Sequence, residues 1–475
     1  MREINLELTM NFDIDIAIFV GYLIINVGFG LYWGRNNKTI ADYALGGRNF
    51  STGTLVSTIM AGWLGGDYLF ITLAQVYTTG LHYAIGCLGM AFGLFLVAYV
   101  FVPRMGEFLG NISVAEAMGN LYGKRVRMIS AICGSIVAAG FLALQFKVFA
   151  SIFRSYLGIS NDYTIYLAGF IVIAYSAFGG IRSIAFTDVI QFFTFGVLIP
   201  VLSIIIWHEY TNINGFDFTV ATSNPMFDYK EFIGLSNPQF WSLIFLFVLF
   251  ATPGFDPTLF QRISIGRSVK QVKKAFTISS ILLLLILCGM SWIGFLLFNV
   301  DPNLEPESLV HYIIDNYSHV GLKGFILVGI GAMCMSNGDA NLNSTSVVIT
   351  HDFLKLLNIK FKSELAFTRI IALIIGGGAI FLASMDYDLL SLVFMTQSYN
   401  LVVVPLIMAI LGFRTTEKAV LIAMAANFIC VLIWRQFFMY TGIDSMVPGD
   451  IASLVFLVGS HYLLKQPGGW IGKRN

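Results

Sequence analysis

The stretch STIMAGWLGGDYLFITLAQVY, residues 57–77, decides how this chain folds. It is apolar and as long as the roughly 20 residues that a helix needs to cross a bilayer, but Gly65, Gly66 and Asp67 interrupt it. A glycine pair alone is also typical of close helix packing. An ionisable group at membrane depth costs at least about 2.5–3.5 kcal/mol, so the adjacent aspartate favours a binding site. We therefore expect a broken membrane helix at this position.

A second apolar segment shows the same signs. ATPGFDP, residues 251–257, contains Gly254 and Asp256 between two prolines, and each proline removes a backbone donor. Unwound backbone is tolerated in a membrane only where it is buried or lines a cavity, and there its carbonyls can bind a cation and its amides an anion. The two breaks fall five spans apart, so the two helices run in opposite directions. This favours a transporter with two inverted repeats.

The composition excludes several classes of protein. Of the 475 residues, 57% are apolar and 12% are charged, whereas soluble proteins average about 45–50% apolar and about 25% charged residues. A soluble enzyme and a disordered chain are therefore excluded. The net charge of +1 provides no basic surface for nucleic acid. The five cysteines lie in apolar segments without CxxC spacing, and no HExxH pair occurs, so neither a disulfide scaffold nor a zinc site is indicated.

Apolar segments recur along the whole chain. In a bilayer they must be helices, because a barrel would show short alternating segments. The predicted fold is an all-α polytopic membrane protein. Its thirteen expected spans are 13–34, 53–77, 83–103, 128–154, 162–179, 189–208, 239–261, 275–299, 322–350, 367–384, 389–412, 418–437 and 447–464.

Lysine and arginine set the expected orientation, because they favour cytoplasmic loops. With the N-terminus outside and the C-terminus inside, the inside loops and tail hold 22 of the 28 basic residues, Arg262 among them. We expect one transporter domain in the cell membrane, without a soluble domain, since the longest outside loop, 209–238, is short. Its parts are a first span with its inside loop (1–51), repeat one (52–208), repeat two (239–413) and two C-terminal spans (414–475). The five-plus-five core comprises spans 2–6 and 7–11.

The ninth span is unusually rich in oxygen donors. It reads GIGAMCMSNGDANLNSTSVV over residues 329–348, and such a density of hydroxyl, amide and carboxylate oxygens suits a dehydrated monovalent cation. Serine and threonine hydroxyls in a span also bridge helices or bond to their own turn. That explanation does not cover Asp339, which needs a partner or a cation.

Four motifs in order resemble the sodium:solute symporter family along almost the whole chain. They are DYALGGR (42–48), YSAFGGIRSIAFTDVIQ (175–191), FQRISIGRSVKQVKKA (260–275) and MSNGDANLNSTS (335–346). Within the family, WLGGDYLFITLAQVY (63–77) is most similar to the choline-transporter-like branch. The resemblance implies inward movement of a solute by alternating access, coupled to sodium, with no other cofactor.

The resemblance also implies a set of cation ligands. Carried over to this chain, they are the backbone carbonyls of Ser57, Met60 and Met333 and the side chains of Ser336 and Asn337. A further cation site would involve Asp188, Ser336 and Asp339, although Ala340 replaces its usual serine. Protons carried by Asp67 or Asp188 are the alternative to sodium.

By the same analogy the solute lies between the two breaks, with spans three, four and eleven as walls. We expect a zwitterionic or amine-bearing solute, its amine near Asp67 or Asp256 and its carboxylate near Lys147. Alternatively, Lys147 neutralises one of those aspartates. The candidate binding residues are Trp63, Asp67, Tyr68, Gln145, Lys147, Phe255, Asp256 and Gln397.

The predicted function is therefore sodium-coupled symport of a small polar organic solute, such as an amino acid, an amine or a choline-like compound. Its partners would be the solute, sodium and the lipid bilayer. A proton-coupled or uncoupled transporter is the first alternative, and a non-transporting solute sensor is the second. An enzyme is not expected, because no nucleophile, histidine and carboxylate gather at one depth.

Overall fold

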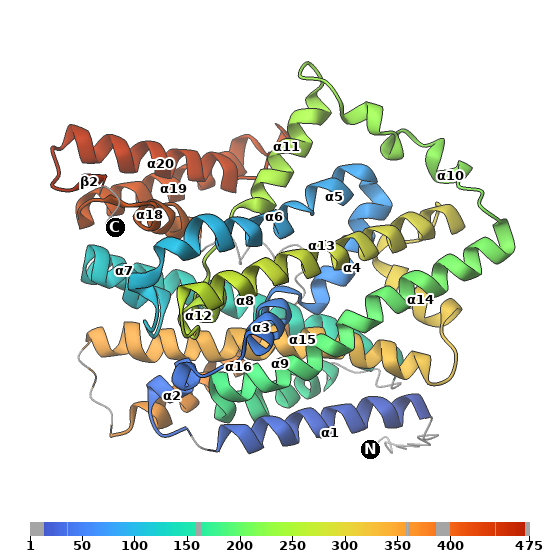
Figure 1. Cartoon of the computed structure of the whole chain (residues 1–475), viewed down its shortest axis with the longest axis horizontal. Helices are drawn as coiled ribbons and strands as arrows, with labels where there is room; N and C mark the ends of the chain where they lie inside the picture. Colours follow the sequence, from blue (N-terminus) through green and yellow to red (C-terminus); the bar gives the residue numbers. More distant parts are fainter. Residues whose placement is uncertain are drawn as a thin grey trace, which may run out of the picture.

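The computed structural model describes residues 14–35, 37–156, 163–357, 359, 362–385, 400–441 and 443–470, and their main elements are helices (Figure 1). A single pair of short antiparallel strands, β1 (Phe413–Arg414) and β2 (Gly469–Trp470), occurs in these residues. The helices are α1 (Ile14–Gly34), α2 (Ile40–Leu45), α3 (Thr52–Trp63), α4 (Gly66–Thr79), α5 (Leu81–Gly86), α6 (Gly89–Leu96), α7 (Val114–Tyr122), α8 (Lys124–Tyr156), α9 (Tyr163–Asn214), α10 (Thr219–Thr222), α11 (Pro238–Ala251), α12 (Pro257–Ser264), α13 (Val269–Val300), α14 (Leu309–Tyr317), α15 (Leu322–Val347), α16 (Glu364–Ser384), α18 (Asn400–Leu411), α19 (Glu417–Phe437) and α20 (Met446–Leu463).

Eight helical segments in the described part of the chain are long and apolar enough to cross a membrane. The bent pair α3 and α4 makes a ninth candidate, and α11 and α18 are shorter apolar helices. Where they are described, the thirteen predicted segments are mostly helical, and the second and seventh are interrupted at residues 64–65 and 252–256. Residues 13, 162 and 389–399 of these segments lie outside the described part. The all-helical membrane class is thereby confirmed.

Helix α9 covers two predicted spans, and a glycine separates them. Straight, its 52 residues would measure about 80 Å, more than twice the thickness of a hydrocarbon core. Gly180 breaks it with φ of 65° and ψ of 178°, a conformation that residues with a Cβ rarely adopt. A Cβ there would also lie 2.7 Å from Asn37 Nδ2 and 2.9 Å from Tyr43 Cδ2. The loop after α1 therefore packs directly into the kink.

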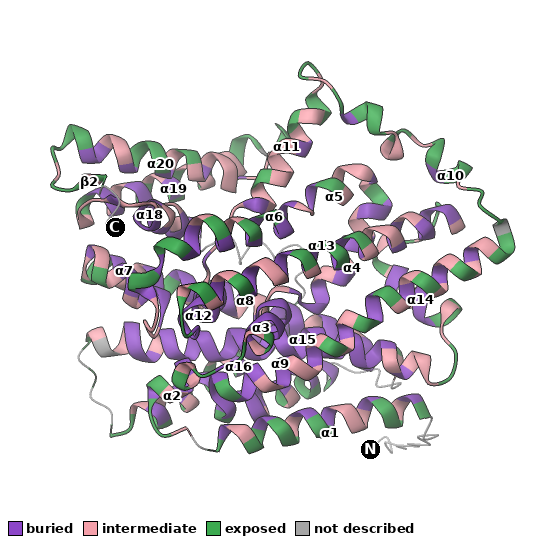
Figure 2. Cartoon of the chain, in the orientation of Figure 1, coloured by how far each residue is buried: buried purple, intermediate pink, exposed green. Residues whose placement is uncertain are grey.

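The distribution of apolar side chains separates a lipid-facing rim from a buried centre (Figure 2). From Ile326 to Val347, every residue of α15 is buried. Helices α1, α9, α16, α19 and α20 instead present large apolar side chains that are more than half exposed. Examples are Ile24, Phe193, Phe381, Phe428 and Val455. Such a rim needs a non-aqueous surrounding, so the chain is a multi-pass membrane protein with α15 at its core.

A cluster of charged residues joins the end of α15 to α7, α8 and α16. The turn 348–354 extends α15 and carries His351, which contacts Glu116 at 3.4 Å and Glu364 at 3.2 Å. Arg127 forms an ion pair of 2.7 Å with Asp352. Burial opposes the charged imidazolium, but the hydrogen bonds with Glu116 and Glu364 and the charge of Asp352 outweigh it and raise the pKa of His351.

This cluster makes a stabilising contribution that depends on pH. The pKa of His351 is higher in the folded protein than in the unfolded chain. The contribution of protonated His351 to the stability is therefore complete below the ordinary histidine pKa of about 6.5, and it disappears as the pH rises through the higher pKa of the folded protein. We expect His351→Gln to lower the stability by an amount on the order of 1 kcal/mol at about pH 6 and by much less at about pH 9. Thermal unfolding at several pH values measures this difference. The same change at exposed His319 is the control, and a pH-independent loss for His351→Gln would contradict the assignment.

Candidate functional site

The break in the second predicted span lies where α3 ends and α4 begins. The two helices are bent by 58°. The first N–H group of α4, on Gly66, donates to Gln145 Oε1 at 3.0 Å, and Gln145 Nε2 donates to Asp67 Oδ1 at 2.7 Å. A Cβ on Gly66 would lie 2.3 Å from Cys334 Sγ. Helix α4 can therefore approach α15 this closely only because residue 66 is glycine.

The second break separates α11 from α12. Asp256 caps α12, because its Oδ1 accepts hydrogen bonds from the N–H groups of Thr258 at 2.8 Å and Leu259 at 3.1 Å. Phe255 has a φ of 46°, which is rare for a bulky residue and marks a constrained site. Its buried ring packs edge-on against Phe101, with the ring centroids 5.2 Å apart. Both predicted breaks are thus present, each with an aspartate in or next to the first helical turn that follows.

A cavity of about 270 Å³ lies between the two breaks. Three of the expected binding residues, Trp63, Tyr68 and Asp256, line it, together with residues from the expected walls. The full lining is Gly62, Trp63, Tyr68, Met90, Val137, Phe141, Leu249, Phe250, Thr252, Gly254, Asp256, Thr258, Asn337, Asn341, Asn400, Val403 and Met446.

The other expected binding residues that the structure describes do not line this cavity. Asp67 and Gln145 are buried behind it, where they bond to each other. Phe255 packs into the core against Phe101, and the half-buried Lys147 on α8 is not part of the described lining. Gln397 lies outside the described residues.

Several cavity residues were not identified from the sequence as solute ligands. Asn341 lies one helical turn from Asn337, so the i, i+4 spacing of the two asparagines could have placed both on one face of the helix. Thr258 directly follows the second break. Asn400 and Met446 carry no local signal, because tertiary packing alone brings α18 and α20 to the cavity.

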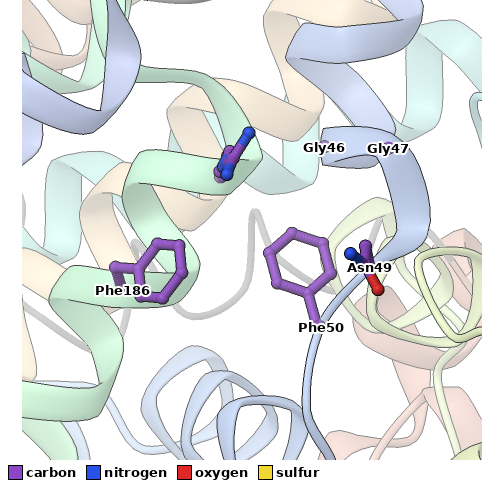
Figure 3. Close-up of a pocket in the computed structure, with 6 residues that line it drawn as sticks. Gly46, Gly47, Asn49, Phe50 and Phe186 are labelled. Carbon is purple, nitrogen blue, oxygen red and sulfur yellow. The ribbon is translucent and has the colours of Figure 1, made fainter.

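A smaller cavity of about 160 Å³ lies elsewhere, between the loop after α2 and α9 (Figure 3). Figure 3 shows the rings of Phe50 and Phe186 on facing sides, with Asn49 beside Phe50. Its lining contains no expected cation or solute ligand. The full lining is Gly46, Gly47, Asn49, Phe50, Arg182 and Phe186.

The expected cation ligands bring α3 and α15 together. Ser336 donates from Oγ to the carbonyls of Ala61 at 3.0 Å and Met333 at 3.1 Å, and Asn337 Nδ2 donates to the carbonyl of Gly62 at 3.1 Å. Carbonyls at the end of a helix lack helical partners, and here those of Ala61 and Gly62 at the end of α3 accept these side-chain hydrogen bonds from α15 instead. Ala61 and Gly62 were missed because a backbone ligand has no signature in its own side chain.

The expected ligands Ser57 and Met60 lie on the same helix, within about one turn before the carbonyls of Ala61 and Gly62. Both are buried in α3. The carbonyl of Met60 accepts the N–H of Leu64 at 3.0 Å, which is the last helical bond before the break. The contact region between α3 and α15 therefore contains carbonyl, hydroxyl and amide oxygens, the ligand types that suit a hard monovalent cation.

Asp188 and Asp339 belong to a second buried polar cluster. Asp188 accepts a hydrogen bond from Thr58 and lies 3.6 Å from Arg262 Nη2, and Asp339 accepts one from Tyr175 at 2.8 Å. Among the described residues, no hydrogen-bond partner meets Oδ1 of either aspartate. Buried carboxylate oxygens without a partner are costly, which makes this cluster a candidate for a bound cation or proton.

The assignment of Arg262 to an inside loop was wrong. Its side chain is only 1% exposed, because α12 is the second half of a broken span and carries Arg262 back into the bundle. It bonds there to the carbonyl of Thr58 at 3.4 Å and to Gln261 Oε1 at 3.1 Å. The positive charge of Arg262 compensates the negative charge of Asp188. It therefore gives no information on which side of the membrane this part of the chain faces.

The four motifs that carry the family resemblance meet in space. Tyr43 donates to the carbonyl of Ala177 at 3.2 Å, which joins the first motif to the second. Gln261 Nε2 donates to the carbonyl of Ala44 at 2.9 Å and to Asn343 Oδ1 at 3.0 Å, so the third motif joins the first to the fourth. The motifs are therefore parts of one packed centre around α3, α12 and α15.

Comparison with known proteins agrees with this arrangement. The chain is 25% identical over 505 aligned positions to the sodium/proline symporter of Staphylococcus aureus strain Newman, covering 98% of this chain and 95% of that relative. In fold it is similar to a Na⁺-coupled sialic acid symporter in a substrate-bound outward-open state, with a TM-score of 0.81, 20% identity and coverage of 96% and 99% of the two chains. It is also similar to a closed nucleobase-cation-symport-1 family transporter, with a TM-score of 0.59, 14% identity and coverage of 91% and 96%.

A family model settles the membership. The description "Sodium:solute symporter family" matches residues 43–426, most of the chain and all four motifs. Members of this family are transporters, which confirms the expectation that the chain is not an enzyme. The chain belongs to the sodium:solute symporter family and is a multi-pass membrane transporter of that family.

Proposed function

We propose that this protein moves a small polar organic solute together with sodium by alternating access. The solute occupies the cavity between the two breaks, and sodium binds between α3 and α15. The observation that supports this assignment most directly is the position of Asn337. It lines the cavity and also bonds to the terminal carbonyl of Gly62 on α3. A cation that holds α3 against α15 therefore also orders one wall of the solute site.

The sodium ligands in this proposal are the carbonyls of Ser57, Met60 and Met333 with the side chains of Ser336 and Asn337. The terminal carbonyls of Ala61 and Gly62 are additional donors. A second cation site at Asp188 and Asp339 is supported by charge balance, because the two carboxylates face one buried guanidinium, that of Arg262. One net negative charge is left, and an uncompensated buried charge is strongly unfavourable. A second monovalent cation is the proposed occupant, and a proton is the competing one.

The proposed organisation has thirteen spans, with a five-plus-five inverted-repeat core made of spans 2–6 and 7–11. The repeats would comprise residues 52–208 and 239–413, preceded by 1–51 and followed by 414–475. The N-terminus would lie outside and the C-terminus inside the cell membrane. The two breaks, one in each proposed repeat and each with an aspartate beside it, support this arrangement.

The solute class includes amino acids, amines and choline-like compounds. The sodium/proline symporters among the relatives favour an amino acid, whereas the resemblance of residues 63–77 to the choline-transporter-like branch favours an ammonium compound. The charge and polarity of the side chains that line the cavity also bear on the choice between an amino acid and an ammonium compound.

Sodium binding to the purified protein tests the proposal. We expect sodium, but not potassium, to raise the thermal unfolding temperature, because an ion that binds only the folded state stabilises it. Ser336→Ala should raise the sodium concentration needed for half of that effect by about tenfold, since losing one ligand to a buried charge costs about 1–3 kcal/mol. Linkage also requires sodium to tighten solute binding and the solute to tighten sodium binding by the same factor.

The matched control is Ser346→Ala. Its hydroxyl lies on the same buried helix but donates to the carbonyl of Asn343 at 2.8 Å, within α15. It should leave the sodium response unchanged. Equal stabilisation by sodium and potassium would refute sodium coupling at this site.

A further inference from the structure

The chain's own carboxylates occupy the start of both helices that follow the breaks. In transporters with broken helices, such N-termini bind anionic groups of the substrate. At α12, Oδ1 of Asp256 accepts the two free N–H groups of Thr258 and Leu259. At α4, the Gly66 N–H is bonded to Gln145, and the Asp67 carboxylate lies in the first turn, bonded to the same glutamine. Neither helix start therefore offers free amides to a carboxylate on the solute, and Asp256, which lines the cavity, would repel one.

The three asparagines of the cavity are held by hydrogen bonds to other parts of the protein. Asn337 Nδ2 donates to the carbonyl of Gly62 at 3.1 Å, Asn341 Nδ2 to that of Asn337 at 2.9 Å, and Asn400 Nδ2 to that of Met446 at 3.4 Å. A backbone carbonyl can only accept, so these contacts determine which amide atom is nitrogen in each case. The amide nitrogens are thus bonded to the protein. Two of the amide oxygens are also engaged, because Asn337 Oδ1 accepts from Asn341 Nδ2 at 3.0 Å and Asn341 Oδ1 accepts from Thr258 Oγ1 at 3.4 Å. Each of these oxygens keeps one further lone pair as an acceptor.

The one charged side chain in the described lining of the cavity is acidic. That lining contains one carboxylate, Asp256, and no lysine, arginine or histidine. Within the described residues, the two hydrogen bonds that cap α12 both end on Oδ1 of Asp256, so Oδ2 remains for a solute. The sequence of residues 386–399 contains no basic residue either. A desolvated carboxylate needs a cationic partner.

The apolar walls suit the same class of solute. The rings of Trp63, Tyr68 and Phe250 line the cavity, and aromatic faces attract ammonium groups. The indole N–H and the phenol O–H can serve a neutral oxygen of the solute. The volume of about 270 Å³ lies below the roughly 300–1,000 Å³ of sites for drug-sized ligands, so the solute is small.

From these observations we infer that the transported solute is a small organic ammonium ion without a carboxylate, held by Asp256 and the aromatic side chains that line the cavity. The inference rests on the proposed symport function and narrows its solute class. It departs from the expectation of a zwitterion with its carboxylate near Lys147, because that residue does not line the described cavity. It also separates this chain from its sodium/proline symporter relatives.

Matched pairs of compounds test the inference. L-prolinol and L-proline share a ring and an amine but differ in a hydroxymethyl group against a carboxylate, and choline and glycine betaine differ in the same way. The purified full-length protein is titrated with each compound in sodium and in potassium, with thermal stabilisation as the readout. In sodium only, we expect the hydroxyl member of at least one pair to bind at least about tenfold more tightly than its carboxylate partner. The reason is that a carboxylate on the solute near Asp256 adds like-charge repulsion.

The variant Asp256→Asn tests whether the carboxylate of Asp256 binds the ammonium group of the solute. Asparagine caps a helix as well as aspartate does, so the variant keeps α12 and removes only the charge. We expect the affinity for the preferred ammonium compound to fall by about thirtyfold or more. Asp228→Asn is the matched control, because Asp228 likewise caps a helical turn, accepting the N–H of Lys230 at 3.0 Å, but does not line the described cavity. This variant should keep both the affinity and the preference for the hydroxyl member.

The outcomes distinguish the inference from the proposed function. Sodium-dependent binding in which neither L-prolinol nor choline is preferred over its carboxylate partner overturns the inference and leaves sodium symport intact. Failure of both ammonium compounds to bind, while sodium alone still stabilises the protein, also overturns it. Binding that is the same in sodium and potassium contradicts the proposed function itself.

Discussion

Replacing Arg262 with methionine will prevent this protein from reaching a stable folded state. The guanidinium lies 3.6 Å from Asp188 Oδ2 and bonds to Thr58 and Gln261, all inside the bundle. Methionine fills similar space but leaves the charge of Asp188 unpaired, and breaking a buried pair costs about 3–5 kcal/mol. That is a large part of the stability of about 5–15 kcal/mol that proteins have. The yield of monodisperse protein in detergent and its unfolding temperature measure the loss.

The double variant Asp188→Asn with Arg262→Met separates charge from packing. Removing both charges of a buried pair is often tolerated, so the double variant should be more stable than Arg262→Met alone. Arg267→Met, at an exposed position five residues later, is the control and should behave like the unchanged protein. If Arg262→Met were as stable as the control, the buried pair would have no structural role.

Gly66→Ala will disrupt the break between α3 and α4. The added methyl group would lie 2.3 Å from Cys334 Sγ and 3.2 Å from Val148 Cγ1. One of the helices must shift, at a cost of about 1–3 kcal/mol for overpacking, and the shift moves α3 and α4 relative to the proposed sodium ligands on α15. We expect a lower unfolding temperature and a sodium affinity reduced by about tenfold or more.

A second substitution should reverse much of this effect. Cys334→Ala removes the sulfur that the new methyl group would meet, so Gly66→Ala with Cys334→Ala should recover both stability and sodium binding. Gly65→Ala should not be rescued by Cys334→Ala, because its methyl group would clash with Asp67 and Gln145 instead. Gly378→Ala, which has nothing within 4 Å, is the tolerated control. Equal rescue of both glycine variants would show that Cys334 acts without steric specificity.

Local sequence predicted the elements of the fold because their causes are local. Apolar length placed the membrane helices, and the glycines and prolines near residues 65 and 254 placed both breaks, since these residue types alter the backbone wherever they occur. The family motifs likewise led us to expect cation ligands on α15, which stays a prediction. Gly180 was recognised as part of a motif, and the structure adds that its positive φ ends one helical segment of α9 and begins the next.

The candidate site could be predicted only where one residue carries its own signal. Trp63, Tyr68 and Asp256 lie directly at the breaks and line the cavity. Lys147 and Gln145 lie on the expected wall helix, but a helix turns by about 100° per residue, so membership of a wall does not decide which side chains reach the cavity. Gln145 instead joins the first turn of α4 to α8.

By itself, the sequence determined that this chain is an all-helical membrane protein with two interrupted helices and oxygen donors in the ninth span, because length, hydropathy and residue type act along the chain. The tertiary structure decided that Arg262 is a buried partner of Asp188 and that Asn337 faces both α3 and the cavity. It also decided that Asp256 is the one carboxylate in the described lining. The physical reason is that the direction of a side chain, and hence its partner, depends on how helices far apart in the sequence pack against one another.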